Sequence, residues 1–228
     1  MKIKIDGEIG WDVYADDIER QFASTSGDVI VEIDSPGGAV FEGVRIYNAL
    51  ANYKGKVTVV IGALAASIAT YIAMAGDEIK AHDNSTFMIH NAWGFAMGDH
   101  RVMRDTAEVL EGLTSLIARK YKERTGMSDA EVRALMDKET FFFGDEIKDA
   151  GFVDEIITTG KADKKSQLAL VKERYKACLK HMKEKEEEIR KDEIAALLRD
   201  VKANEDDKVA KAKLRLAQAK LKLFERGL

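Results

Sequence analysis

The sequence predicts an α/β fold with a largely parallel sheet, followed by a charged α-helical C-terminal tail. Strand-like and helix-like segments alternate as far as residue 160, and no glycine or proline then occurs before Gly227. Charge divides at the same place, because residues 1–160 hold 16 basic and 27 acidic residues, whereas residues 161–228 hold 20 and 13. We therefore expect a folded domain at residues 1–160 and a separate tail at residues 161–228.

The elements of the first part follow from hydrophobic period and turn residues. Residues 28–34 form a β-branched run that stops at Ser35-Pro36-Gly37-Gly38, and from residue 39 apolar residues recur with helical spacing. Ser128 and Glu131 predict a capping box for a helix from residue 129. The strands read as continuous apolar runs, so we expect the sheet to be buried on both faces. The other predicted elements, in order, are a strand at 56–61, a turn at Gly62, a helix at 66–74, strands at 78–81 and 86–90, helices at 101–124, 129–138 and 145–150, and a strand at 152–157.

The composition excludes several classes of protein. With 46% hydrophobic and 33% charged residues the chain is typical of a soluble globular protein, and no apolar run is long enough to cross a bilayer. The N-terminus lacks a secretory signal and the single cysteine, Cys178, excludes an intramolecular disulfide, so we expect a cytoplasmic protein. No histidine pair has zinc-ligand spacing and no Walker A loop occurs, so we expect no metal and no cofactor. We expect no membrane partner, since no apolar run is long enough, and no nucleic-acid partner, since a net charge of −4 is not that of a strongly basic binder.

Three segments contain residues that could take part in catalysis. The glycines after Pro36 let the backbone approach a ligand closely, and Ser67 follows a buried strand at a predicted helix start, where free N–H groups can receive negative charge. His90 ends an apolar strand and is a reasonable general base. Taken singly, each has a plain structural explanation: a tight turn, a serine that packs or caps a helix, and a hydrogen-bonded core histidine.

Taken together, the segments resemble a known family. Asp34–Gly38, Gly62–Ile68 and Phe87–Asn91 are similar, in sequence and in spacing, to the proteolytic subunit of the Clp protease, and Gly151–Asp154 is similar to the sequence that closes that family's domain. The resemblance covers most of residues 1–159. It implies the ClpP/crotonase-like superhelix of β-β-α units, and it implies a serine-type endopeptidase that cleaves proteins through an acyl-enzyme.

The same resemblance assigns the site residues. It implies that Ser67 is the nucleophile, that His90 is the general base, and that the backbone N–H groups of Gly38 and Ile68 form the oxyanion hole. The long helix predicted after His90 is similar to the handle by which rings of this family stack. We therefore expect a ring-forming homo-oligomer that acts on protein substrates.

The third member of the catalytic triad departs from the family pattern. Counting back from Gly151, the family's aspartate position is occupied by Glu139, which can orient and stabilise an imidazolium with one more methylene of reach. Asp137 is the competitor for this role. In a third alternative, Glu139 is a solvated charge and the enzyme works with a Ser–His dyad.

A second departure concerns the subtype. We expect the fold to begin at about Ile5, without the N-terminal segment that in this family forms axial loops against the unfoldase ATPase, and we therefore expect no ATPase partner. Residues 6–10 and 46–48 look like those of the Clp-related head maturation proteases of tailed phages and prophages. This resemblance implies a prohead protease that processes scaffold and capsid proteins, in the host cytoplasm or the assembling capsid. The alternatives are a host Clp peptidase subunit that works with an ATPase, a non-peptidase on the same fold such as an acyl-CoA hydratase, and a non-catalytic assembly protein.

The tail, residues 161–228, consists mostly of strong helix formers. Apolar residues recur every seven positions from Leu168 to Ile189, but Lys185 and Asp192 interrupt the pattern of a coiled coil. Two interpretations stay open. The tail is a solvated or partly disordered extension, or it is an assembly segment that docks the protease to scaffold or capsid through its basic excess.

Overall fold

The computed structural model describes residues 1–158 and, further along, residues 191, 194–196, 198–199, 211–212, 214–215 and 217–218. The chain divides into two compact units, Met1–Val171 and Lys172–Leu228, and the first contains the sheet and its helices. The predicted boundary at residue 160 lies outside the described residues, as does most of the predicted tail; the tail residues that are described are helical. No helix in the described parts of the chain is long and apolar enough to cross a membrane.

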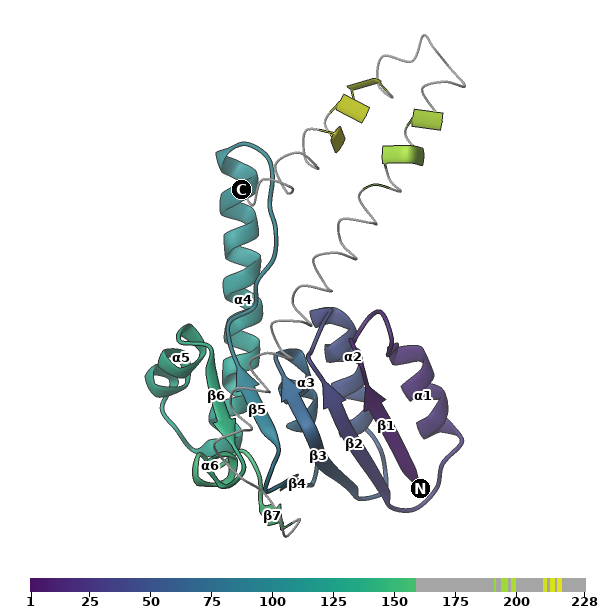
Figure 1. The fold of residues 1–228 in the computed structure, drawn as a ribbon, viewed down its shortest axis with the longest axis vertical. Helices are drawn as coiled ribbons and strands as arrows, with labels where there is room; N and C mark the ends of the chain where they lie inside the picture. Colours follow the sequence, from purple (N-terminus) through teal and green to yellow (C-terminus); the bar gives the residue numbers. More distant parts are fainter. Residues whose placement is uncertain are drawn as a thin grey trace. The chain divides into compact units, whose positions relative to one another are not determined.

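The first unit is built on a seven-stranded sheet (Figure 1). Five strands lie in the order β1-β2-β3-β4-β7, while β5 pairs with β3 and, on its other side, with β6. All neighbouring strands are parallel except β5 and β6, which are antiparallel. The predicted α/β fold with a largely parallel sheet is therefore confirmed. The strands are β1 (Lys2–Asp6), β2 (Val29–Ser35), β3 (Val57–Ala66), β4 (Glu78–His82), β5 (Thr86–Ile89), β6 (Thr140–Phe143) and β7 (Glu155–Ile157).

Helices connect most of the strands (Figure 1). The predicted helices are confirmed with small shifts at their ends, and the capping box of α5 is present: the Ser128 hydroxyl accepts from the N–H of Glu131, whose carboxylate accepts from the N–H of Ser128. Three short elements, β1, α1 and β6, were not predicted. The residue before α1, Tyr14, makes no capping hydrogen bond with its side chain, so the usual N-cap signal is missing, and β6 depends on its pairing with β5. The helices are α1 (Ala15–Ala23), α2 (Val40–Ala51), α3 (Ile68–Ala73), α4 (His100–Thr125), α5 (Asp129–Asp137) and α6 (Asp145–Asp149).

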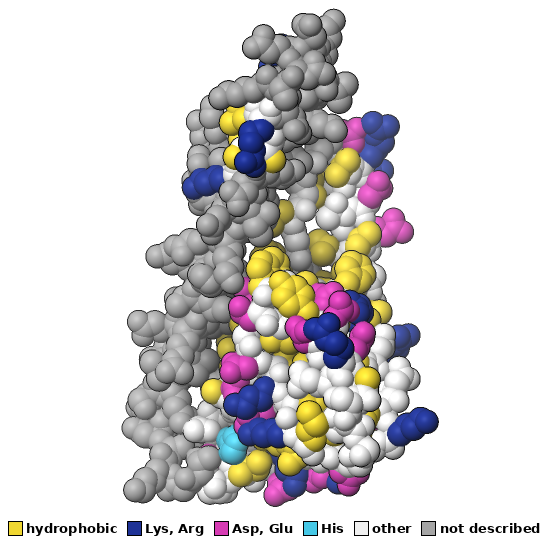
Figure 2. All heavy atoms as spheres, turned by 90° about the vertical axis from the view of Figure 1, so that its right-hand side faces the viewer, with side chains coloured by type: hydrophobic (Ala, Val, Ile, Leu, Met, Phe, Trp, Pro, Cys, Tyr) yellow, Lys and Arg dark blue, Asp and Glu magenta, His cyan; other side chains and the backbone are white. Residues whose placement is uncertain are grey.

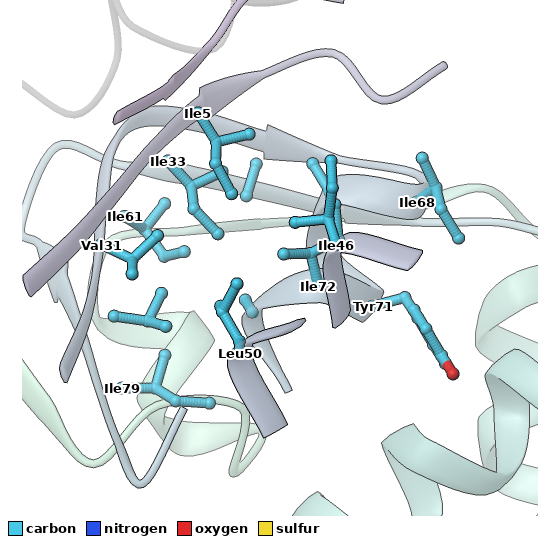
Figure 3. Packing of buried hydrophobic residues seen from close by; sticks show 14 of the residues in the cluster. Ile5, Val31, Ile33, Ile46, Leu50, Ile61, Ile68, Tyr71, Ile72 and Ile79 are labelled. Atoms are coloured by element: carbon cyan, nitrogen blue, oxygen red, sulfur yellow. The ribbon is translucent and has the colours of Figure 1, made fainter. Parts of the chain in front are cut away.

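A large part of the core lies between the sheet and helices α2 and α3 (Figure 3). Ile46 and Leu50 of α2, together with Ile68 and Ile72 of α3, are buried against the strands. Fully burying an aliphatic side chain of this size stabilises the fold by about 1.5–3 kcal/mol. This packing therefore sets where α3 lies, and α3 begins at the candidate site. The buried residues of the sheet that face these helices include Ile5, Val31, Ile33, Ile61 and Ile79.

The opposite face of the sheet is exposed in places, so the prediction of a sheet buried on both faces is wrong. Along β1, exposed and buried side chains alternate, and the Nζ atoms of Lys2 and Lys4 lie 2.8 and 3.8 Å from the carboxylate of Glu32 on β2. The hydrogen bond from Lys2 holds the pKa of Glu32 below its usual value, although partial burial acts against this. A period of two with charged residues on one side is typical of a sheet with one solvated face.

Strand β3 contains a bulge that redirects it toward the candidate site. It pairs with β4 along residues 58–61 and with β5 along residues 64–66. At this point its register against β2 shifts, because one residue of β2, Asp34, lies opposite three residues of β3. The turn predicted at Gly62 is therefore wrong: the strand continues through Gly62 as a bulge.

Side chains satisfy the backbone polar groups of this bulge. The carboxylate of Asp34 accepts hydrogen bonds from the N–H groups of Ala63 and Leu64, the latter at 3.2 Å. The hydroxyl of Ser85 donates to the carbonyl of Ile61 at 2.9 Å. Because these backbone groups have partners, the bulge is a defined structure and the end of β3 has a defined direction.

The loop between β1 and α1 packs against the start of α2. The N–H of Ala15 donates to the carboxylate of Glu42 at 2.8 Å, and this contact joins the two segments. Trp11 and Tyr14 on the loop and Phe41 on α2 remain exposed. Figure 2 shows hydrophobic side chains among charged ones on this side of the molecule, which carries α1 and β1. The loop therefore packs against the segment that leads from β2 into α2 and helps to hold it in place.

Candidate active site

The predicted catalytic segments meet at one edge of the sheet. Strands β2, β3 and β5 are neighbours and run parallel, so their carboxyl ends lie at the same edge (Figure 1). β2 leads into Gly37 and Gly38, β3 ends directly before Ser67, and β5 ends directly before His90. Parallel sheets of this kind bind their ligands at the carboxyl ends of the strands. The candidate site is therefore at this edge.

Ser67 has a strained backbone. Its φ of 57° and ψ of −129° lie in a region that residues other than glycine rarely adopt, at a cost of about 1–3 kcal/mol. Both of its backbone polar groups are held: the N–H donates to the carbonyl of Met88 at 2.9 Å, and the carbonyl accepts from the N–H of Thr70 at 3.0 Å. A serine on such a sharp turn from strand to helix presents its hydroxyl at the edge of the sheet.

The two glycines after β2 allow the chain to pass close to both Ser67 and Ile9. Gly37 has a φ of +100°, and an added Cβ would lie 2.6 Å from the Cβ of Ser67. At Gly38 an added Cβ would lie 2.1 Å from the carbonyl oxygen of Ile9. Hydrogen bonds of 2.8 Å from Ile9 to Gly37 and from Ala39 to Ile9 hold the loop. A side chain at Gly37 would displace the loop from Ser67, and a side chain at Gly38 would displace it from Ile9.

Two backbone N–H groups near Ser67 are placed to receive negative charge. The residues on either side of Gly38 form the hydrogen bonds of the glycine loop, but the N–H of Gly38 itself has no acceptor in the described part of the chain. Ile68 is the first residue of α3, where N–H groups lack a partner within the helix. Helix α2 packs closely on this residue, because an added Cβ at Gly43 would lie 2.2 Å from the Ile68 side chain. Both predicted oxyanion donors thus lie on segments that close packing holds in place.

His90 lies between Ser67 and Glu139. Its Nε2 is 2.8 Å from the Oγ of Ser67, and its Nδ1 is 3.2 Å from Oε1 of Glu139. An ionised carboxylate only accepts hydrogen bonds, so this contact assigns the proton to Nδ1 and leaves the lone pair of Nε2 facing the hydroxyl. The imidazole side chain is 6% exposed, whereas the side chain of Glu139 is 63% exposed. The imidazole is therefore the buried member of the row, between a half-buried serine and a largely exposed carboxylate.

The pairing of β5 with β6 explains why Glu139 reaches His90. The two strands are antiparallel, and their last pair before the site is Ile89 with Thr140. One step forward along β5 and one step back along β6 place His90 opposite Glu139. Glu139 itself has a φ of 48°, in the left-handed region. The sheet register thus selects the residue that faces the imidazole.

Asp137, the competitor for this role, has a different partner. Its Oδ1 accepts a hydrogen bond from the side-chain amide of Asn91 at 2.8 Å. Asp137 ends α5, two residues before Glu139, and the structure records no hydrogen bond between Asp137 and His90 within residues 1–158. The geometry therefore favours Glu139 among the three alternatives for the triad.

Several residues that support the site were not predicted. Asp34 and Ser85 hold the bulge of β3, and Thr70 holds the carbonyl of Ser67. Such polar residues occur throughout the sequence, so no pattern distinguished these from others. Of the supporting residues, Asp34 and Gly37 lay within the motif Asp34–Gly38, but neither was given a role. In the part of the chain that the structure describes, no group of three or more His, Cys, Asp or Glu side chains could hold a metal ion.

A serine, a histidine and a carboxylate in a hydrogen-bonded row are the arrangement of the serine hydrolases. Residues 2–160 match the model of the family described as Clp protease. This match covers more than half of the chain, and the chain belongs to this family.

Two curated relatives are similar to the chain over the same region. The ATP-dependent Clp protease proteolytic subunit of Chlorella vulgaris is 34% identical over 134 residues, which are 58% of this chain and 66% of the algal protein. The protein of the same description from Oltmannsiellopsis viridis is 29% identical over 136 residues, 59% of this chain and 70% of the relative. The chain thus spans about two thirds of the length of these relatives.

Proposed function

We propose that the protein is a serine-type endopeptidase that works through an acyl-enzyme, with Ser67, His90 and Glu139 as its catalytic residues. The observation that carries this proposal is the row of contacts from the Ser67 hydroxyl through the imidazole to the Glu139 carboxylate, at 2.8 and 3.2 Å. The same row performs peptide hydrolysis on several unrelated folds. Membership of the Clp protease family adds independent support.

The first half of the reaction transfers the acyl part of the substrate to Ser67. The Oγ of Ser67 attacks the carbonyl carbon of the peptide bond while Nε2 of His90 accepts the hydroxyl proton. The carboxylate of Glu139 stabilises the imidazolium that forms. His90 then gives its proton to the leaving amine, the C–N bond breaks, and the acyl-enzyme remains.

The oxyanion of this step needs hydrogen-bond donors that are already in place. We assign this role to the backbone N–H groups of Gly38 and Ile68. Fixed donors of this kind act on charge that develops in the transition state, and loss of one typically lowers kcat by about 10²–10³-fold. The glycine loop and the first turn of α3 supply them without a side chain.

The second half of the reaction returns the enzyme to its starting state. Water attacks the ester carbonyl, and Nε2 of His90 accepts one of its protons. His90 then protonates the Oγ of Ser67 as the ester bond breaks. The products are a peptide with a free carboxyl end and the regenerated serine hydroxyl, so the reaction needs water and no cofactor.

Labelling with a fluorophosphonate tests the proposal without knowledge of the natural substrate. The phosphoryl group should attach to one residue, Ser67, as located by mass spectrometry of peptides. Ser67→Ala should abolish labelling, whereas Ser24→Ala, which removes an exposed serine hydroxyl elsewhere, should leave it unchanged. Folded wild-type protein that stays unlabelled, or that is labelled equally after Ser67→Ala, would contradict the proposal.

For the natural substrate, we propose scaffold and capsid proteins of a tailed phage, cleaved by a ring-forming homo-oligomer in the host cytoplasm or the assembling capsid. Two features support this subtype: residues 6–10 and 46–48 resemble the head maturation proteases, and the basic excess of residues 161–228 suits an acidic partner. The competing role is that of a peptidase subunit served by an ATPase. The relatives favour it, because both are described as ATP-dependent.

A cleavage assay separates the two roles. The purified protein is incubated with a phage scaffold protein and, separately, with a folded reporter that carries a degradation tag. Each is tested with and without a Clp unfoldase and ATP, with Ser67→Ala as the inactive control. Scaffold cleavage without ATP supports the head maturation role. Cleavage of either substrate only when unfoldase and ATP are both present supports the ATPase-served role.

A further inference from the structure

A buried chain of hydrogen bonds links helix α4 to the nucleophile. The Oη of Tyr121 on α4 lies 2.6 Å from the Oγ1 of Thr70 on α3, and the Thr70 hydroxyl donates to the carbonyl of Ser67. Thr70 and Tyr121 are 0 and 1% exposed. Side chains of two helices thus form a chain whose last member, Thr70, contacts the backbone of the strained Ser67.

The protons of this chain have one possible order. The carbonyl of Ser67 can only accept, so the hydroxyl of Thr70 uses its single proton there. The hydroxyl of Tyr121 therefore donates to Thr70. Burial raises the pKa of Tyr121 well above the usual value for tyrosine, with the Thr70 hydrogen bond acting the other way, so this donor keeps its proton at neutral pH.

The carbonyl of Ser67 and the N–H of Ile68 belong to one peptide group. Because a trans peptide is planar, its C=O and N–H point in opposite directions and turn together. Hydrogen bonds that fix the carbonyl therefore also fix the direction of the Ile68 N–H. They fix the ψ of Ser67 as well, which is −129° and strained.

We propose that Tyr121 is a positioning residue: acting through Thr70, it holds the Ser67–Ile68 peptide group so that the Ile68 N–H is aimed at the oxyanion. This inference rests on the proposed peptidase function. It adds a residue of α4, far from Ser67 in sequence, to the groups that set the reaction rate. The role differs from stabilisation, because the chain holds a donor that is needed in the transition state.

Three single variants test the chain by their second-order rate of fluorophosphonate labelling. Thr70→Val removes the donor to the Ser67 carbonyl and should lower the rate by about tenfold, the equivalent of one hydrogen bond. Tyr121→Phe leaves Thr70 able to donate and should lower it by only about two- to threefold. Thr70→Ser keeps a hydroxyl and should recover most of the rate lost in Thr70→Val. With a fluorogenic peptide, the losses should fall on kcat and leave KM unchanged.

The double variant Thr70→Val/Tyr121→Phe separates positioning from stability. Thr70→Val alone leaves a buried tyrosine hydroxyl unpaired, so its Tm should fall. Adding Tyr121→Phe removes that hydroxyl, and the Tm should rise again toward wild type. The labelling rate should stay about tenfold low, because the Ser67 carbonyl still lacks its side-chain donor. A rate that recovers together with the Tm would overturn the proposal.

A matched control and the wild type complete the design. Tyr71 follows Thr70 directly on α3, and its hydroxyl makes no hydrogen bond within residues 1–158, so Tyr71→Phe should not change the rate. Failure of wild-type Ser67 to react would contradict the peptidase function itself. A reactive wild type, together with Thr70→Val that reacts equally fast, would overturn only the role of Tyr121.

Discussion

Ser67 and Glu139 are the two residues other than glycine that have a positive φ among those the structure describes, 57° and 48°, and they lie on either side of the His90 imidazole. Their surroundings differ. Ser67 is held at its N–H by β5, at its carbonyl by Thr70, and against its side chain by Gly37. The side chain of Glu139 bonds to His90 and is otherwise largely open to solvent, with 63% of it exposed.

The difference follows from what each residue would do in the reaction. An attacking atom has to be placed within a few tenths of an ångström, because a displacement of 1 Å can cost about 10²-fold in rate. A carboxylate that orients and stabilises an imidazole acts over a longer range, and solvent screens part of its charge. We therefore expect the nucleophile side to be sensitive to small changes and the carboxylate side to be more tolerant.

The largest effect on kcat is expected at the histidine, which lies between the nucleophile side and the carboxylate side of the site. His90→Ala removes the base that contacts the Ser67 hydroxyl, and kcat should fall by about 10⁴–10⁶-fold. His100→Ala, which removes an exposed histidine at the start of α4, serves as the control and should leave kcat unchanged. Steady-state kinetics on a fluorogenic peptide measure both. A His90→Ala enzyme within tenfold of wild type would argue against histidine-assisted attack.

On the nucleophile side, Gly37→Ala should lower the labelling rate by about 10²-fold, because its Cβ would meet the Cβ of Ser67 at 2.6 Å. Gly27→Ala is a matched control: Gly27 has a φ of +77°, but nothing lies within 4 Å of an added Cβ. Both variants should lose about 1–2 kcal/mol of unfolding free energy through backbone strain. Equal labelling rates for the two variants would show that the loop does not place the nucleophile.

On the carboxylate side, Glu139→Gln should lower kcat by about 10–100-fold, because an amide cannot stabilise the imidazolium and can favour the wrong tautomer. Glu139→Asp should be milder, and Asp137→Asn should change kcat by less than about twofold. The readout is kcat/KM on one peptide. The reverse ranking would move the role to Asp137, and no effect of either would indicate a Ser–His dyad.

The smallest effect concerns stability at Glu139. Asparagine tolerates the left-handed region better than glutamate, so Glu139→Asn should raise the free energy of unfolding by about 0.5 kcal/mol while lowering kcat as Glu139→Gln does. Asp137→Asn removes a carboxylate nearby without a change at a positive φ. Urea unfolding of the two variants measures the difference. If Glu139→Asn unfolds with no higher free energy than Asp137→Asn, then the positive φ of Glu139 does not lower the stability of the wild-type protein.

The predictable parts of the molecule are those in which a local pattern suffices. The strand before Ser35, the amphipathic helix α2 and the capping box of Ser128 each carry their signal within a few residues. The meeting of the segments that contain Gly38, Ser67 and His90 was expected from their resemblance to the Clp proteolytic subunit, and parallel neighbouring strands bring their ends together. Two predictions were wrong. One face of the sheet was expected to be buried, but it carries the charged side chains of β1 and β2 and is exposed to solvent. Gly62 forms a bulge where a turn was expected.

By itself, the sequence determined the α/β alternation, the division of charge near residue 160 and the residue types at three strand ends, because hydrophobic period and turn chemistry act over neighbouring positions. Only the tertiary structure decided which carboxylate faces His90. Glu139 and Asp137 are two residues apart and chemically alike, and the antiparallel register of β5 with β6 separates them. The link from Tyr121 through Thr70 is decided in the same way. Contacts between distant segments depend on pairing and packing across the fold, which no local pattern encodes.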